Sequence, residues 1–188
     1  MKTNHPKAPL IVVSGASGSG KTTLCRLVAQ RLHFHYAVSH TTRPQRAGEF
    51  EAKDYYFVTK DQFDQMVKSG DFLEWAQVYD NFYGTSKKTL YDYLSKGQGV
   101  IVDVDTQGAQ SIKEKVPESV TIFIQVPTLK ELEKRLIDRR RDPPEVLQKR
   151  LKQATHEENQ KDQYDHVIIN DNLELAYSAL ERIIKKCL

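Results

Sequence analysis

The feature that most constrains this sequence is a glycine-rich turn that directly follows a short apolar run. The apolar run covers residues 10–13, and the turn reads GASGSGKT over residues 15–22. It fits the pattern G-x-x-x-x-G-K-[ST], in which glycines let consecutive backbone N–H groups curl around an anion. Apolar residues then recur at helical spacing between Leu24 and Leu32. The sequence therefore predicts a strand, a phosphate-binding loop and a helix in succession; the alternative is a glycine-rich turn that only caps the helix.

The residue types of this loop suit the binding of nucleotide phosphates. The start of the following helix contributes unpaired N–H donors and the positive end of the helix dipole. The Lys21 side chain can reach β- and γ-phosphates, and the Thr22 hydroxyl can bind Mg²⁺. Phosphates are therefore expected along the whole loop, at Gly15, Ala16, Ser17, Gly18, Ser19, Gly20, Lys21, Thr22 and Thr23.

Length and charge narrow the class of protein. A chain of 188 residues accommodates one domain, or one core with small inserted subdomains. The formal net charge of +3 is too balanced to predict a nucleic-acid partner, although a basic cleft for phosphates could lie within it. The two cysteines, Cys25 and Cys187, lack metal-ligand spacing, which favours a reducing, cytoplasmic setting. No membrane span or signal peptide is predicted.

Apolar runs that alternate with helical patterns predict the fold class. Four such runs begin at Leu10, Val100, Val120 and Val167, which is typical of an α/β protein with a parallel sheet covered by helices on both faces. Residues 37–86 break this pattern, because they are rich in aromatic side chains and short strands. Strands are expected at 34–39, 55–58 and 72–79, with a turn and a short extended piece at 81–86. This region is predicted to be an inserted α+β subdomain.

Two aspartates follow the apolar run that begins at Val100. In open α/β sheets, ligands bind outside the carboxyl ends of the strands, where Asp103 and Asp105 are expected. An acidic residue at this place, in a chain with a phosphate-binding loop, can hold Mg²⁺ directly or through water. The alternative is a carboxylate that only caps the next helix.

Arginines form two groups. Arg43 and Arg46 lie in a loop with Pro44 and Gly48, and their planar guanidinium groups suit a phosphate monoester. The alternative is that both arginines are solvated surface charges, and without other context the sequence of the loop favours this alternative. The second group consists of Arg135, Arg139, Arg140, Arg141 and Arg150.

The second group surrounds a charged, proline-containing segment at about 138–146, which is predicted to be a mobile cover. Arg135 and Arg139 are four residues apart and share a helix face. Arginines on a hinged segment can neutralise charge on a transferring phosphoryl group. For Arg140 and Arg141 a solvated face is the stronger alternative.

Glu74 is an acidic residue within the aromatic strand FLEW. A buried carboxylate needs a hydrogen-bonding partner. The N1–H and N2–H₂ groups of a guanine would fit it as a pair of donors. An internal salt bridge is an equal alternative.

Several segments together carry a resemblance to a known family. They read GASGSGKTT, SHTTRPQRAGE followed by KDYYFV, FLEWAQVYDNFYGTS, VIVDVDTQG and VIINDN, in this order. From about residue 8 to 186 the chain resembles guanylate kinases, which implies transfer of phosphate from ATP to GMP with Mg²⁺, in purine nucleotide metabolism. It also implies a core of residues 1–36, 87–136 and 147–188, a GMP-binding subdomain of 37–86 and a lid of 137–146. The expected partners are small-molecule nucleotides, and the sequence leaves room for a homo-oligomer.

The resemblance also implies roles for individual residues. Guanine would contact Ser39, Glu74, Thr85 and Asp105, and the GMP phosphate would contact Arg43, Arg46, Tyr55 and Tyr83, with Glu49 in the same site. Thr22 and Asp103 would hold the metal, and Asn170 would lie near the adenine of ATP. The catalytic residues would be Lys21, Arg43, Arg135, Arg139 and Arg150.

The chain departs from the family pattern at three places. Ala16 replaces a common proline, Thr85 stands where serine is frequent, and the lid segment RRRDPPEV is unusually basic and rich in proline. Two other functions remain open. One is a non-catalytic module that binds a phosphorylated protein through the arginine pocket. The other is a kinase for a different nucleotide or small phosphorylated metabolite.

Overall fold

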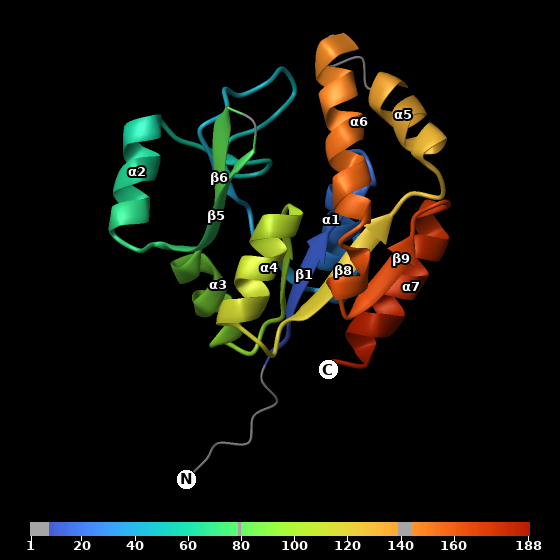
Figure 1. The fold of residues 1–188 in the computed structure, drawn as a ribbon. Coiled ribbons are helices and arrows are strands. Elements are labelled where there is room, and N and C mark those ends of the chain that lie inside the picture. Colours follow the sequence, from blue (N-terminus) through green and yellow to red (C-terminus); the bar gives the residue numbers. More distant parts are fainter. Residues whose placement is uncertain (1–7, 79, 139–143) are drawn as a thin grey trace.

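A parallel five-stranded sheet forms the centre of the molecule (Figure 1). The computed structural model describes residues 8–78, 80–138 and 144–188, without the side chains of residues 138, 144–147, 149 and 150. The strand order is β2-β7-β1-β8-β9, and every pairing is parallel. The strands are β1 (Leu10–Ser14), β2 (His35–Tyr36), β7 (Val100–Asp103), β8 (Val120–Gln125) and β9 (His166–Ile169). The predicted α/β class is confirmed.

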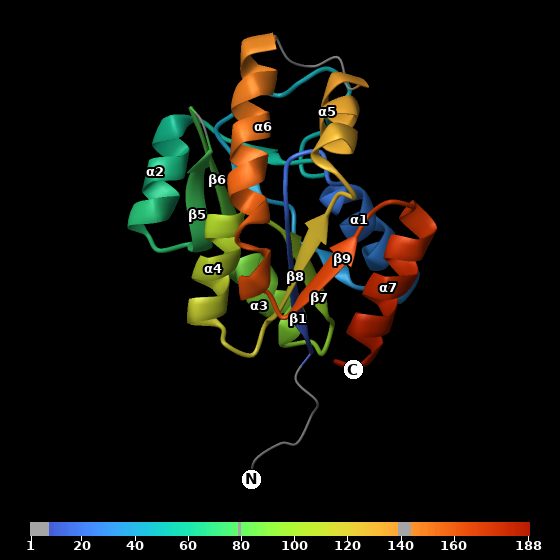
Figure 2. The same cartoon turned by 45° about the vertical axis from the view of Figure 1, so that its right-hand side comes forward.

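Helices cover both faces of this sheet (Figures 1 and 2). Side chains alternate along a strand, so Ile11 and Val13 of β1 pack with α1 and α7, whereas Leu10 and Val12 pack with α3 and α4. Two further helices, α5 and α6, continue the chain from β8 to β9. The bounds are α1 (Lys21–Leu32), α3 (Lys87–Leu94), α4 (Thr106–Lys115), α5 (Leu129–Asp138), α6 (Pro144–Glu158) and α7 (Leu173–Lys185), with a 3₁₀ turn at Lys161–Gln163.

A second, mixed sheet lies beside the core with helix α2 (Lys60–Lys68) against it. Its order is β4-β3-β6-β5, with β3 and β4 parallel and the other pairs antiparallel. The strands are β3 (His40–Thr41), β4 (Tyr56–Phe57), β5 (Phe72–Val78) and β6 (Asn81–Ser86). This element set confirms the predicted α+β insertion.

Two expectations about strands were wrong. The segment 81–86 is a complete strand, because Gly84 leaves room for the ring of Phe72 on β5, and a Cβ at Gly84 would lie 2.9 Å from that ring. The strand expected at 34–39 is limited to β2 at His35–Tyr36, which joins the core sheet; β3 begins beyond that segment, at His40, and joins the second sheet.

Helices α5 and α6 pack against the glycine-rich loop. Ala16 is buried with Leu132 and Leu136 of α5 and Ala154 of α6. A Cβ at Gly18 would lie 3.1 Å from both leucine side chains. The loop therefore has an apolar support on its outer side. Within the described residues, no helix combines the length and the apolar character needed to cross a membrane.

Candidate active site

One cleft of about 820 Å³ connects the glycine-rich loop with the second sheet. It lies at the carboxyl end of β1 and β7, where ligands bind in open α/β sheets. Most of the predicted site residues line it, although they come from both sheets and their connecting loops. These are Gly15, Ser17, Gly18, Gly20, Lys21, Thr22, Thr23, Ser39, Arg43, Arg46, Glu49, Tyr55, Glu74, Tyr83, Asp103 and Asp105.

The loop depends on glycine for its conformation. Gly15 and Gly20 have φ angles of 136° and 92°, in a region that other residues rarely adopt. A Cβ on Gly15 would collide with the backbone oxygen of Ile124 on β8, and one on Gly20 would collide with the amide of Asn170. Close approach to the sheet and to Asn170 thus fixes the path of the backbone whose N–H groups would bind phosphates.

Lys21 lies over this loop in the structure. Its Nζ donates hydrogen bonds to the carbonyl oxygens of Gly15 at 2.6 Å and Ala16 at 3.1 Å. The ammonium group is therefore held at the mouth of the loop, in the same cleft as the exposed Thr22 at the start of α1. The positive charge of Lys21 would therefore lie next to a phosphate bound in the loop.

Three residues predicted to bind ATP do not line the cleft. The side chains of Ala16 and Ser19 are buried, so only their backbone can face a nucleotide. Asn170 is also buried, and its Nδ2 donates to the carbonyl oxygen of Ser19 at 2.7 Å. In this structure Asn170 supports the loop; its contact with adenine stays a prediction.

The two aspartates after β7 have different environments. Asp105 is the N-cap of α4, and its Oδ1 accepts a hydrogen bond from the Gly108 N–H at 2.7 Å, so it does cap the next helix. Asp103 ends the strand, and its Oδ2 is buried without a hydrogen-bond partner among the described residues. Carboxylate and hydroxyl oxygens are ligands that Mg²⁺ prefers. The unpaired oxygen of Asp103 and the Thr22 hydroxyl therefore fit a magnesium ion in this cleft.

Glu74 lines the cleft from β5 of the second sheet and is buried, with only 4% of its surface exposed. The register of β5 and β6 places it opposite Thr85, whose hydroxyl donates to Oε1 at 2.6 Å. Burial raises the pKa of Glu74 to about 7, with the nearby Asp105 adding to the rise and the Thr85 hydrogen bond opposing it. Among the described residues Glu74 forms no salt bridge, so that alternative is not realised.

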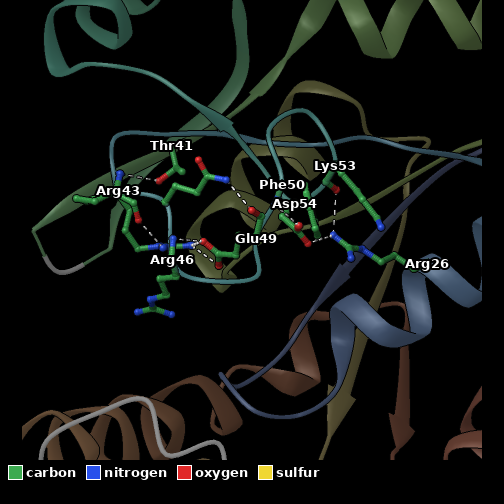
Figure 3. Close-up of polar contacts among 10 residues, drawn as sticks. Arg26, Thr41, Arg43, Arg46, Glu49, Phe50, Lys53 and Asp54 are labelled. Carbon is green, nitrogen blue, oxygen red and sulfur yellow. Dashed lines mark hydrogen bonds and ion pairs between the residues drawn. The ribbon is translucent and has the colours of Figure 1, made fainter.

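The loop between β3 and β4 holds its arginines in different ways (Figure 3). Arg43 donates to both Glu49 carboxylate oxygens, at 2.8 and 3.0 Å, and its guanidinium lies 5.4 Å from the ring centre of Tyr55. The Arg46 N–H donates to Glu49 at 2.9 Å, while its exposed guanidinium points away from that carboxylate. Glu49 therefore braces the two arginines, which leaves Arg46 extended in the cleft.

The remaining predicted arginines are less defined. Arg135 does not line the cleft, and its Nε donates to Glu131 on the same helix at 2.9 Å. Arg139 lies outside the described residues, and Arg150 lies in α6 without a described side chain. Their contacts with transferring phosphates stay predictions, as does the lid at 137–146.

Sequence reasoning missed several residues that line the cleft. Arg26, Tyr36 and Asp54 border it on the side of α1, and Gln153 and Glu157 border it from α6. Glu157 is buried, and its Oε1 accepts a hydrogen bond from Gln153 at 3.1 Å. Its surroundings in the sequence, THEEN, are polar and indicate a solvated helix face. No local signal marked it.

Comparison with known proteins identifies the family that this geometry suits. A protein-family model described as guanylate kinase matches residues 7–187. The chain belongs to the guanylate kinase family. A guanylate kinase of Fusobacterium nucleatum is 44% identical over 176 residues, which cover 94% of this chain and 95% of that protein. A guanylate kinase of Carboxydothermus hydrogenoformans is 43% identical over 179 residues, which cover 95% of this chain and 88% of that protein.

Solved structures agree with this assignment. The crystal structure of guanylate kinase from Anaplasma phagocytophilum superposes with a TM-score of 0.80 at 32% identity, covering 96% of this chain and 86% of that one. A shikimate kinase from Bacteroides thetaiotaomicron, at 13% identity and a TM-score of 0.51, shares the fold alone.

Proposed function

We propose that the chain transfers the γ-phosphoryl group of ATP to GMP, giving ADP and GDP. One observation supports this proposal most directly: the same cleft is lined by the glycine-rich loop and by the buried Glu74, whose carboxylate accepts a hydrogen bond from the Thr85 hydroxyl. A phosphate donor and a guanine-bearing acceptor could therefore lie in one enclosure with their phosphates facing each other. Membership of the guanylate kinase family supports the same reaction.

The acceptor end of the cleft suits guanine. The Glu74 carboxylate can accept hydrogen bonds from the N1–H and N2–H₂ groups of the base, and the Thr85 hydroxyl fixes its orientation. Ser39 and Asp105 line the same cleft. An adenine edge would present a ring nitrogen without a hydrogen to this carboxylate, so two acceptors would face each other and selectivity would follow.

The acceptor phosphate would lie among cations and phenol groups closer to the loop. Arg43 and Arg46 supply positive charge, and the rings of Tyr55 and Tyr83, 5.8 Å apart between centres, border them. The GMP phosphate needs little help from a general base, because its second pKa is about 6 and it is largely dianionic at neutral pH. The main obstacle is repulsion between two polyanions.

Residues at the donor end address this repulsion. Backbone N–H groups of the loop and the Lys21 ammonium would bind the ATP phosphates. Thr22 and Asp103 would hold Mg²⁺, which neutralises charge on the phosphates when it is bound. Enclosure of both nucleotides would exclude the water that could otherwise hydrolyse ATP.

An assay of ADP release with Mg²⁺, ATP and each of GMP, AMP, CMP and UMP tests the proposal. We expect turnover that strongly favours GMP, and a loss of kcat of about 1,000-fold in Lys21→Ala, because a cation beside the transferring phosphate is removed. Equal turnover with all four monophosphates would contradict guanine recognition. Binding of GMP without turnover of any monophosphate would indicate a binding module instead.

A further inference from the structure

Helix α1 carries two arginines whose ion pairs reach different parts of the molecule. Arg31 donates to both carboxylate oxygens of Glu174 on α7, at 3.0 and 3.2 Å, so this exposed pair joins two helices that cover the central sheet. Arg26 donates through Nη2 to Asp54 Oδ1 at 2.7 Å and to the Lys53 carbonyl oxygen at 3.0 Å. Both acceptors belong to the inserted segment ahead of β4 (Figure 3). The Arg26 pair therefore crosses from the core to the insertion.

The loop that receives Arg26 is closed by its own hydrogen bonds. Asp54 Oδ2 accepts from the Phe50 N–H at 2.8 Å, and the Asp54 N–H donates to the Phe50 carbonyl oxygen at 3.0 Å. One carboxylate oxygen thus braces the loop while the other holds the arginine. The guanidinium of Arg26 also lies 5.5 Å from the ring centre of Tyr36, at the entry to the insertion. The contact fastens a preformed loop to α1.

Each end of this contact lies next to groups that would bind a phosphate. Arg26 is four residues beyond Thr22, so both lie on the same face of α1. Asp54 directly precedes Tyr55, whose ring lies beside the Arg43 guanidinium. Arg26 and Asp54 both line the cleft. A shift of the loop along α1 would therefore move the acceptor-phosphate groups relative to the donor-phosphate groups.

We propose that Arg26 and Asp54 are positioning residues that set the separation between the acceptor-phosphate site and the donor-phosphate site. This inference rests on the proposed function, since only a two-substrate transfer depends on that separation. Neither side chain needs to touch the reacting atoms, because each acts through its neighbours on α1 and at Tyr55. Misplacement of reacting groups by about 1 Å can cost up to about 100-fold in rate.

A double-mutant cycle tests the proposal. We expect Arg26→Gln and Asp54→Asn each to lower kcat about 10-fold, with the KM for ATP within about twofold of wild type. The double variant is expected to match the single variants, since either change removes the same ion pair. Arg31→Gln and Glu174→Gln are matched controls, because that ion pair joins the same helix, α1, to α7 and not to the insertion. The Arg31 guanidinium also faces an aromatic ring, that of Tyr177. The controls should keep kcat within about twofold.

Single variants that keep kcat within about twofold, or losses that multiply in the double variant, would overturn the proposal. Thermal unfolding of every variant separates positioning from loss of fold. If Asp54→Asn does not fold, the comparison of Arg26→Lys with Arg26→Gln provides the test. The lysine retains a charged donor toward Asp54 and should recover most of the rate. An equal loss of kcat in both variants would overturn the proposal. Absence of turnover in the wild-type protein with GMP would refute the proposed function as well, whereas active wild type with unaffected variants refutes this inference alone.

Discussion

Backbone atoms line one end of the cleft, whereas side chains line the other. At the proposed donor end, glycine backbone and one lysine line the cleft, and the backbone path is set by close contact with β8 and Asn170. At the proposed acceptor end, side chains from several short strands and a loop line the cleft, and ion pairs such as Arg43 with Glu49 hold them. A backbone site tolerates many sequence changes outside its glycines. A side-chain site depends on each partner in turn, so substitutions should affect the two ends differently.

The largest expected effect is at a glycine of the donor end. Gly15→Ala should lower turnover at least about 100-fold and the free energy of unfolding by about 3 kcal/mol, because its φ of 136° is strained and its Cβ would collide with the Ile124 oxygen. Gly70 is the matched control: its φ is 70°, no atom lies within 4 Å of its added Cβ, and it does not line the cleft. Gly70→Ala should cost about 1 kcal/mol and leave turnover unchanged. Thermal unfolding and steady-state kinetics measure both; similar losses in the two variants would contradict the steric account.

A smaller effect is expected at the acceptor end. Arg43→Gln should raise the KM for GMP about 50-fold while the KM for ATP stays within about twofold, because a charge-assisted contact to one phosphate is lost. Glu49→Gln should raise the KM for GMP about 10-fold, since Glu49 binds the Arg43 side chain and the Arg46 N–H. Steady-state kinetics with each substrate varied in turn measure both KM values. An equal rise in the KM for ATP would mean that the two ends are not separate.

The smallest expected effect concerns stability and pH. Burial raises the pKa of Glu74 to about 7, above its ordinary value of 4.5, so the folded protein binds this proton more tightly than the unfolded chain. The resulting stability is complete below pH 4.5 and is lost as the pH rises to about 7. Glu74→Gln stays neutral, so its free energy of unfolding should exceed that of wild type by about 1–2 kcal/mol at pH 8 and by less at pH 5. Urea unfolding at both pH values checks this, with the exposed Glu133→Gln as control. A difference that does not change with pH would contradict the raised pKa.

The same contrast explains what could be predicted from sequence. The glycine-rich loop can be recognised from eight consecutive residues. The apolar runs that alternate with helical patterns predicted the parallel sheet. Glu74 was marked as unusual because an acidic residue interrupts an aromatic strand, and Thr85 entered through the family resemblance alone. Their contact depends on the register of β5 and β6. Local sequence patterns were sufficient where one continuous segment forms the phosphate-binding loop.

Contacts between distant charged residues could not be predicted. Arg26 and Asp54 are 28 positions apart, and each fits equally well as a solvated surface residue. Glu49 was expected in the GMP site only as part of a motif, whereas the structure shows it bracing Arg43 and the Arg46 backbone. The choice of partner for a polar side chain depends on the packing of both sheets, which hydropathy patterns do not describe.

Recognition of guanine by Glu74 is tested most directly by calorimetric titration of Glu74→Gln with GMP and, separately, with Mg²⁺ and ATP. The titration belongs at pH 8, above the raised pKa of about 7, where wild-type Glu74 is mainly ionised. We expect an affinity for GMP about 30-fold weaker, because an amide donor then faces the donors of guanine, and an affinity for ATP within about twofold of wild type. Equal weakening for both nucleotides would contradict separate donor and acceptor ends and the role of Glu74 in recognising guanine.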